Sequence, residues 1–167
     1  MKLPRDEEGA AMVEFALVLP LLLLLIFGIA EFGRAWNINQ TLADAAREAA
    51  RRAVVRDGPA AAKVGDATAP GTVPAVVLDR LRRAGISTTG AWDPADYTAD
   101  CSGWSPPTDE VTAAQVSGCG WGRTTGEEAR VAIRLPYGFL LVKPLLGLLG
   151  GEIDGRTFET NYVMRNE

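Results

Sequence analysis

One acid, Glu14, interrupts an otherwise apolar stretch that runs from Gly9 to Ala30 (GAAMVEFALVLPLLLLLIFGIA). The 16 uncharged residues from Phe15 to Ala30 would rise about 24 Å as a helix, less than the roughly 30 Å hydrocarbon core of a bilayer. A helix that starts at Ala10 has 21 residues and rises about 31 Å, so the stretch spans a bilayer only if Glu14 enters with it. An ionised side chain costs about 2.5–3.5 kcal/mol at the bilayer centre and less near the edge. We therefore expect Glu14 either to have a cationic partner or to lie in the headgroup zone of an ordinary single-pass anchor.

The two cysteines, Cys101 and Cys119, form the second chemically informative pair, and 17 residues lie between them. A disulfide across this loop would stabilise a small domain by roughly 3 kcal/mol in the chain-entropy model. Such a bond requires an oxidising compartment, which would place the C-terminal part of the chain outside the cytoplasm. The alternatives are a metal site, which needs more ligands than two cysteines, and redox chemistry, for which no C-x-x-C motif exists.

Other residue types argue against catalysis and against nucleic acid as a partner. Histidine is absent, which removes histidine triads, histidine-ligated metals and a histidine pH switch. A net charge of −4 and a pI near 5.0 do not suit a phosphate backbone. The sequence has no Gly-rich phosphate loop and no G-x-S-x-G nucleophile motif. We predict that the protein is not an enzyme and that it has no cofactor and no metal site.

Three tryptophans lie in the same region as the cysteines: Trp92, Trp104 and Trp121. They could form a sugar-binding or adhesive surface. Beside a disulfide in a small domain, however, aromatic residues more often belong to the core, and we favour that interpretation.

The apolar stretch is followed by more helical sequence, because residues 34–57 contain neither Gly nor Pro and are rich in Ala. We predict one continuous helix from about Met12 to Val55, kinked at Pro20 because proline removes a backbone hydrogen bond, and ended by Gly58-Pro59. Its second half carries an apolar stripe at helical spacing, which we interpret as a helix-packing seam: Leu42, Ala46, Ala49 and Ala53.

The remaining sequence predicts a small domain. Residues 58–72 are rich in turn formers and indicate a connector, and a short helix follows from Pro74 to Ala84 with Gly85 as its cap. Residues 86–128 indicate a long loop region with short strands. Two longer strands are predicted at Ala129–Leu135 and, less regularly, at Arg156–Met164. Between them the apolar stretch 137–149 is too short to span a bilayer, so it packs on the domain core or rests on the membrane surface.

The predicted fold class is therefore α+β. A long N-terminal transmembrane helix, with residues 10–30 in the membrane and 31–57 outside it, continues into a disulfide-stapled domain of residues 58–167 with an antiparallel sheet. The lipid bilayer is thus an expected partner. Lys2 and Arg5 precede the span while Arg34 and Arg47 follow it, so the positive-inside rule does not set its orientation.

The junction from Gly9 to Phe15 resembles the class III signal of type IV pilins and pseudopilins. In that signal a prepilin peptidase cuts after a glycine, a glutamate stands five residues past the cut, and in tight-adherence (Flp-type) pilins an aromatic residue follows. The resemblance implies a leader of residues 1–9, a cut between Gly9 and Ala10, and an assembly and recognition role for Glu14 and Phe15. It also implies that the Glu14 carboxylate pairs with the new N-terminal amine of its own or a neighbouring subunit.

More narrowly, residues 9–36, the helix AAREAARRAVV and the closing NYVMRNE look like a TadE-like minor pseudopilin. This resemblance implies a structural component of a tight-adherence pilus in the cytoplasmic membrane, incorporated into a surface pilus or assisting its assembly. Its implied partners are the prepilin peptidase, other pilins and the assembly platform.

Two other functions compete with this one. An uncleaved single-pass anchor that displays an adhesive domain would keep its leader and would tolerate the loss of Glu14. A membrane-tethered enzyme would need a polar cleft in residues 58–167.

Overall fold

The computed structural model describes residues 6–55, 64, 69–86, 97–108, 114–121, 126–148 and 150–166, with side chains from Gly9 onward. It divides into two compact units. The first unit contains Met1–Trp36 and Gly138–Asp154, and the second contains Asn37–Tyr137 and Gly155–Glu167.

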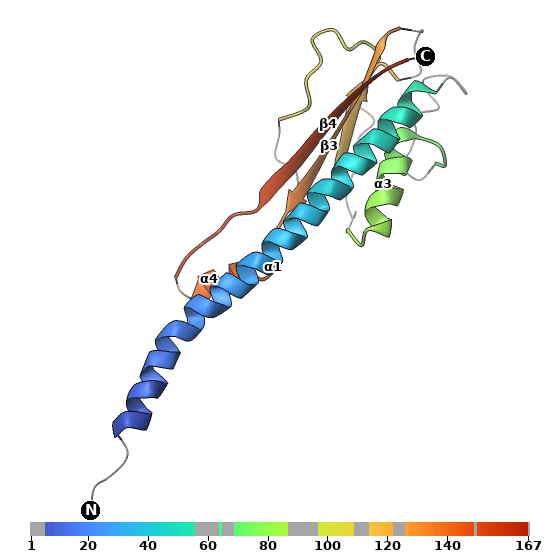
Figure 1. Ribbon diagram of the computed structural model, residues 1–167. Coiled ribbons are helices and arrows are strands. Elements are labelled where there is room, and N and C mark those ends of the chain that lie inside the picture. The colour runs from blue at the N-terminus through green and yellow to red at the C-terminus, as the bar shows by residue number, and fades with distance from the viewer. Residues whose placement is uncertain are drawn as a thin grey trace, which may run out of the picture. The chain divides into compact units, whose positions relative to one another are not determined.

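Helix α1, Asp6–Val54, runs through 49 residues and confirms the predicted long helix (Figure 1). Arg51 and Arg52 in its last turn have the sign of charge that suits the C-terminal end of a helix dipole. The helical assignment continues through Pro20, and a kink there stays a prediction.

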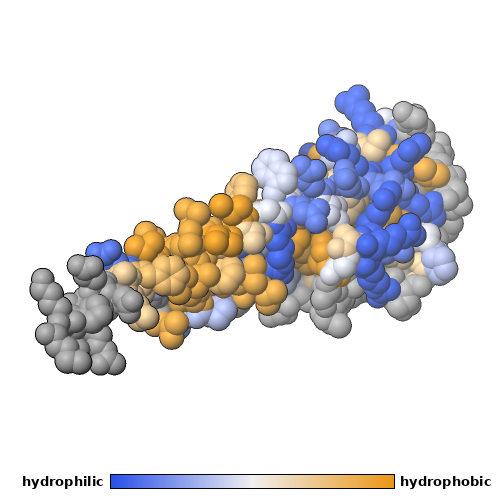
Figure 2. All heavy atoms as spheres, turned by 60° about the horizontal axis from the view of Figure 1, so that its bottom comes forward, coloured by the Kyte–Doolittle hydropathy of each residue, from blue (hydrophilic) through white to orange (hydrophobic). Residues whose placement is uncertain are grey.

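The first unit combines the N-terminal part of α1 with α4, Val142–Leu148. In the most apolar 18-residue window of α1 no residue is buried by other parts of the chain. In Figure 2 the face of this part of the helix that is in view is mostly hydrophobic. A helix that is apolar on all sides and uncovered by its own chain needs lipid or other helices around it.

The second unit is built on a four-stranded sheet in the order β1-β2-β3-β4. Its strands are β1, Tyr97–Thr98; β2, Gln115–Cys119; β3, Glu128–Tyr137; and β4, Arg156–Arg165. The two longest strands were predicted, and their antiparallel pairing from Glu128↔Arg165 to Tyr137↔Arg156 confirms that part of the sheet.

The predicted antiparallel pairing is present in β2, β3 and β4, and β1 adds a parallel pair with β2 that makes the sheet mixed. The physical reason is the length of the connection between these two strands. Antiparallel neighbours can be joined by a tight hairpin, whereas parallel neighbours need a crossover of about a dozen residues or more. Sixteen residues, 99–114, separate β1 from β2.

Helix α3, Val73–Arg83, and the second half of α1 lie together beside the sheet (Figure 1). Thr72 caps α3, because its Oγ1 accepts a hydrogen bond from the Ala75 N–H at 3.2 Å. Gly85, with φ +73°, follows the helix as the sequence predicted. Polar contacts link α1 to α3 and to the turn before it. Arg52 Nε donates to the Gly71 carbonyl, and Arg80 pairs with Glu48 at 3.7 Å.

The core of the second unit lies between these helices and the sheet. α1 contributes mostly alanines, which let the neighbouring backbones approach closely, and α3 and β3 contribute larger aliphatic side chains. The fully buried members include Leu42, Ala46, Ala49, Ala53, Val73, Val77, Leu81, Val131 and Ile133.

Candidate functional site

The junction identified in the sequence lies inside helix α1. Gly9, Ala10, Glu14 and Phe15 are all helical and exposed. Ala10 and Glu14 are four residues apart, so they lie on the same side of the helix, one turn from each other. Within the described part of the chain, the Glu14 carboxylate makes no hydrogen bond or ion pair. The junction therefore presents a carboxylate and apolar side chains to the surroundings.

A second acid, Glu31, ends the apolar stretch and has the opposite environment. Only 3% of this residue is exposed. Its Oε1 accepts a hydrogen bond from Arg34 Nη1 at 2.8 Å. Its Oε2 accepts bonds from the backbone N–H groups of Leu140 at 3.1 Å and Leu141 at 2.8 Å. Three donors thus satisfy a carboxylate that would otherwise be buried at a large cost.

Arg34 completes this arrangement by donating from the same Nη1 to the Gly138 carbonyl at 3.1 Å. The two side chains hold the segment that enters α4 against α1. Sequence reasoning missed this role of both residues. The i,i+3 spacing of Glu31 and Arg34 was visible, but their backbone partners lie more than 100 residues further along the chain.

The apolar stripe on the second half of α1 is buried within the chain. Leu42, Ala46, Ala49 and Ala53 have no exposed surface within the single chain. They pack inside the second unit, so they cannot also face the helix of a neighbouring subunit. The predicted helix-packing seam is therefore covered within the chain itself. The amphipathic pattern was real, but its buried face meets the chain's own domain.

The predicted disulfide between Cys101 and Cys119 is present, with a Cα–Cα distance of 5.2 Å. Cys119 is the last residue of β2 and pairs in register with Thr98 of β1. The bond therefore fastens the chain that follows β1 to the end of β2, beside the two residue pairs that join these strands among the described residues.

The tryptophans do not share one environment. Trp121 is fully buried, as the core interpretation predicted. Its Nε1 donates to the Arg130 carbonyl at 2.8 Å, and its ring lies 4.8 Å from that of Tyr97. Trp104 is half-buried, and Trp92 lies outside the described residues.

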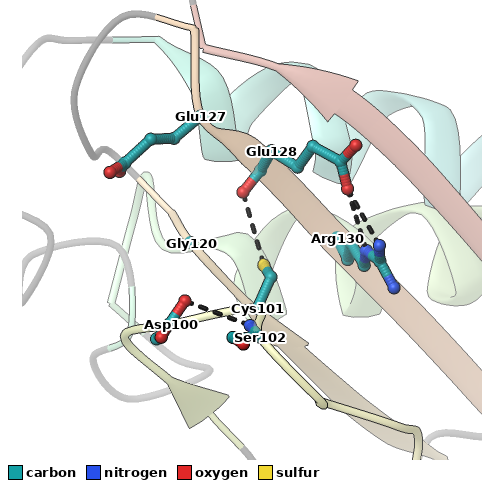
Figure 3. Close-up of a pocket in the computed structure, with 7 residues that line it drawn as sticks. All are labelled: Asp100, Cys101, Ser102, Gly120, Glu127, Glu128 and Arg130. Carbon is teal, nitrogen blue, oxygen red and sulfur yellow. Dashed lines mark hydrogen bonds and ion pairs between the residues drawn. The ribbon is translucent and has the colours of Figure 1, made fainter.

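A polar hollow of about 330 Å³ lies beside the disulfide (Figure 3). Its lining consists of Asp100, Cys101, Ser102, Gly120, Glu127, Glu128 and Arg130.

Two of the acids that line this hollow are engaged in local structure. Asp100 accepts from the Ser102 N–H at 3.0 Å, and Glu128 pairs with Arg130 at 2.9 Å. Cys101 Sγ lies 3.3 Å from the Glu128 carbonyl oxygen, but a disulfide sulfur has no proton to donate, so this is a contact only. Among the described residues, no group of three or more His, Cys, Asp or Glu is placed to hold a metal.

In a comparison with known protein families, the N-terminal part of the chain gives a match. Residues 9–51 match the family model described as TadE-like protein. This segment is TadE-like. No curated protein and no solved structure matches the chain.

The TadE-like segment begins at Gly9, so it includes the junction, the apolar stretch and both Glu31 and Arg34. It ends at Arg51, before the disulfide and the sheet. The match suggests a component associated with Tad pili. Helix Gly9–Val54 is long and apolar enough, by length and composition, to cross a membrane. The helix and the match together fit a membrane-anchored protein.

Proposed function

We propose that this chain is a TadE-like minor pseudopilin, a structural and assembly component of a tight-adherence (Flp-type) pilus. A prepilin peptidase removes residues 1–9, and α1 then anchors the protein in the cytoplasmic membrane with the disulfide-bonded domain outside the cytoplasm. The protein acts by helix packing with other pilins and the assembly platform, and not by catalysis. The observation that carries the proposal is Glu14, an exposed carboxylate one turn beyond Ala10, in the part of α1 that the rest of the chain leaves uncovered.

Cleavage between Gly9 and Ala10 gives this carboxylate a partner. It leaves a free amine on Ala10, which carries a positive charge at neutral pH. The amine lies about 6 Å along the helix axis from Glu14, so it pairs with Glu14 of the same subunit or of a neighbour. Pairing lowers the cost of holding an ionised carboxylate at the membrane edge, and an intersubunit pair fixes how far one helix slides along the next.

Gly9 suits the cleavage step because it weakens the helix at the bond to be cut. The Gly9–Ala10 bond lies within α1, whereas a peptidase needs the bond in an open, extended form. A glycine inside a helix costs about 1 kcal/mol relative to alanine. An added Cβ at Gly9 would meet nothing within 4 Å, so packing does not explain this glycine.

The exposed apolar side chains of α1 supply the surface for helix packing. They surround the helix instead of forming one stripe, and they include Met12, Phe15, Leu17, Leu21, Leu25 and Ile29. Such a surface can contact several neighbouring helices in the core of a filament, and lipid before assembly.

The first prediction concerns processing. When the full chain is expressed with a prepilin peptidase, we expect a protein that begins at Ala10, and without the peptidase a protein that keeps residues 1–9. Intact mass and N-terminal sequencing of the membrane-extracted protein measure this directly. Gly9→Val should stop the cut, because a branched side chain replaces the residue that the peptidase reads.

Gly33→Val is the matched control, since Gly33 is another exposed glycine of α1 with nothing within 4 Å of an added Cβ. It should be processed normally. A full-length chain under conditions in which a control pilin is cut would reject the pseudopilin and favour the uncleaved anchor that displays its domain.

The second prediction concerns Glu14. Glu14→Gln keeps the size of the side chain but loses its charge, so we expect normal cleavage and a loss of the protein from sheared pili of at least about tenfold, equivalent to about 1.4 kcal/mol. Quantitative immunoblots of the membrane and sheared-pilus fractions measure the ratio. Glu48→Gln, which removes an exposed acid from the second half of α1, should leave that ratio unchanged. Equal ratios for the two variants would exclude a pairing role for Glu14.

A further inference from the structure

The apolar segment that precedes and forms α4 has no place in the core. We call residues 138–148 (GFLLVKPLLGL) the return segment. Helix α4 has no buried residue, and Leu140 and Leu148 are 66% and 83% exposed. Eight of its eleven residues are apolar, counting Phe139 and Pro144, and one residue, Lys143, is charged. Such a composition is unusual on a surface that faces only water.

The return segment is fixed at one position along α1. The Glu31 carboxylate accepts from the Leu140 and Leu141 N–H groups, and Arg34 donates to the Gly138 carbonyl. All of these groups belong to the first unit. The return segment is therefore attached to the helix where its apolar stretch ends.

That position coincides with the edge of a bilayer. If Ala10 lies at one surface of the hydrocarbon core, Glu31 lies 21 residues and about 31 Å further on, at the other surface. The hydrogen bonds to Glu31 thus hold apolar side chains at the depth where headgroups meet acyl chains.

Two aromatic residues of α1 lie close to Glu31, near the same surface of the hydrocarbon core. Phe32 and Trp36 are exposed, and their rings lie 6.2 Å apart one turn from each other. Exposed aromatic rings just beyond an apolar span are typical of the membrane interface. Lys143, exposed on α4, can extend its ammonium group toward lipid phosphates while its aliphatic stem stays among the leucines.

We propose that the return segment is a second membrane contact, which lies in the interface of the bilayer that α1 spans and is held there by Glu31 and Arg34. It fixes the depth and the rotation of the helix relative to the membrane surface. The proposal rests on the membrane anchoring proposed above, but it requires neither leader cleavage nor pilus assembly.

Lipid-borne quenchers test this proposal on the full chain. Single cysteines replace Leu148, Leu21 or Val163 in separate proteins, and each is labelled with an environment-sensitive fluorophore without reductant so that the Cys101–Cys119 disulfide stays closed. The proteins are reconstituted into phosphatidylcholine–phosphatidylglycerol vesicles with or without brominated acyl chains. Leu21 reports the span, and Val163, an exposed apolar residue of β4, is the matched control outside it.

We expect the fluorophores at Leu148 and Leu21 to lose about half of their emission in brominated vesicles, with Leu148 quenched best by bromines near the headgroups. The fluorophore at Val163 should be unaffected. Quenching at Leu21 with none at Leu148 would overturn the proposal while leaving the anchor intact. A fluorophore at Leu148 that is shielded from water but not quenched by lipid would show that protein covers the segment, and would also overturn it. No quenching at Leu21 would reject the anchor itself, and the proposal with it.

Glu31→Ala tests the attachment. In this variant quenching at Leu148 should fall toward the Val163 value while quenching at Leu21 stays constant. Glu31→Gln keeps an oxygen that can accept from both N–H groups, so it should retain most of the quenching. Glu48→Ala removes an exposed acid elsewhere on α1 and should leave the quenching at Leu148 and at Leu21 unchanged. Unchanged quenching at Leu148 in Glu31→Ala would show that Glu31 does not hold the segment.

Discussion

Replacing Trp121 with alanine should lower the free energy of unfolding of the second unit by about 3–5 kcal/mol. The indole is fully buried, lies against the Tyr97 ring and donates to the Arg130 carbonyl. It occupies the space over Gly118, where an added Cβ would lie 2.5 Å from the ring carbon Cζ2. The alanine variant loses this packing and leaves the carbonyl without its buried donor, so a cavity and an unsatisfied polar group add together.

Urea unfolding of the full chain in detergent, followed by near-UV circular dichroism, measures this change. Trp104→Ala is the matched control, because Trp104 is only half-buried in the same region, and it should cost less than about 2 kcal/mol. A cost for Trp121→Ala as small as that for Trp104→Ala would exclude Trp121 as the centre of the core.

The elements that the sequence predicted are those whose pattern is local. The long helix, α3, β3 and β4 follow from periodicity, from the absence of breakers in residues 34–57 and from cap residues such as Gly85. The TadE-like junction is equally local, because Gly9, Glu14 and Phe15 fall within seven residues.

The features that the sequence did not predict depend on contacts between distant residues. No local pattern assigns backbone N–H groups at 140 and 141 to a carboxylate at 31. The parallel pairing of β1 was not predicted either, because a strand of two residues has no periodicity in the sequence.

The alanine stripe illustrates a different difficulty. Its pattern correctly indicated a buried helix face, but amphipathicity does not say whether the partner is the same chain or another. Only the fold assigns Ala46 and Ala49 to the chain's own core. The apolar surface of α1 that the chain leaves uncovered is then the segment that carries Glu14, and the proposed assembly would have to use that segment.

A glycine beside the disulfide should be almost as sensitive as Trp121. Gly120 has φ +70°, and an added Cβ would collide with the Glu128 carbonyl oxygen and lie 3.0 Å from Cys101 Sγ. Neither neighbour can move easily, because Glu128 is paired in the sheet with Arg165 and Cys101 is tied to Cys119. We expect Gly120→Ala to cost about 1–2 kcal/mol for the left-handed backbone and about 1–3 kcal/mol more for overpacking.

Gly103→Ala separates the two contributions. Gly103 has nearly the same backbone angle, φ +72°, but an added Cβ there would meet nothing within 4 Å. Gly103→Ala should therefore lower the free energy of unfolding only by the cost of the left-handed backbone. The difference between the two variants in urea unfolding then gives the cost of overpacking at Gly120. Equal losses would mean that the chain around Glu128 and Cys101 yields to the new methyl group. A larger loss at Gly120 would mean that the disulfide and the β3–β4 pair together form the rigid end of the domain, as their contacts indicate.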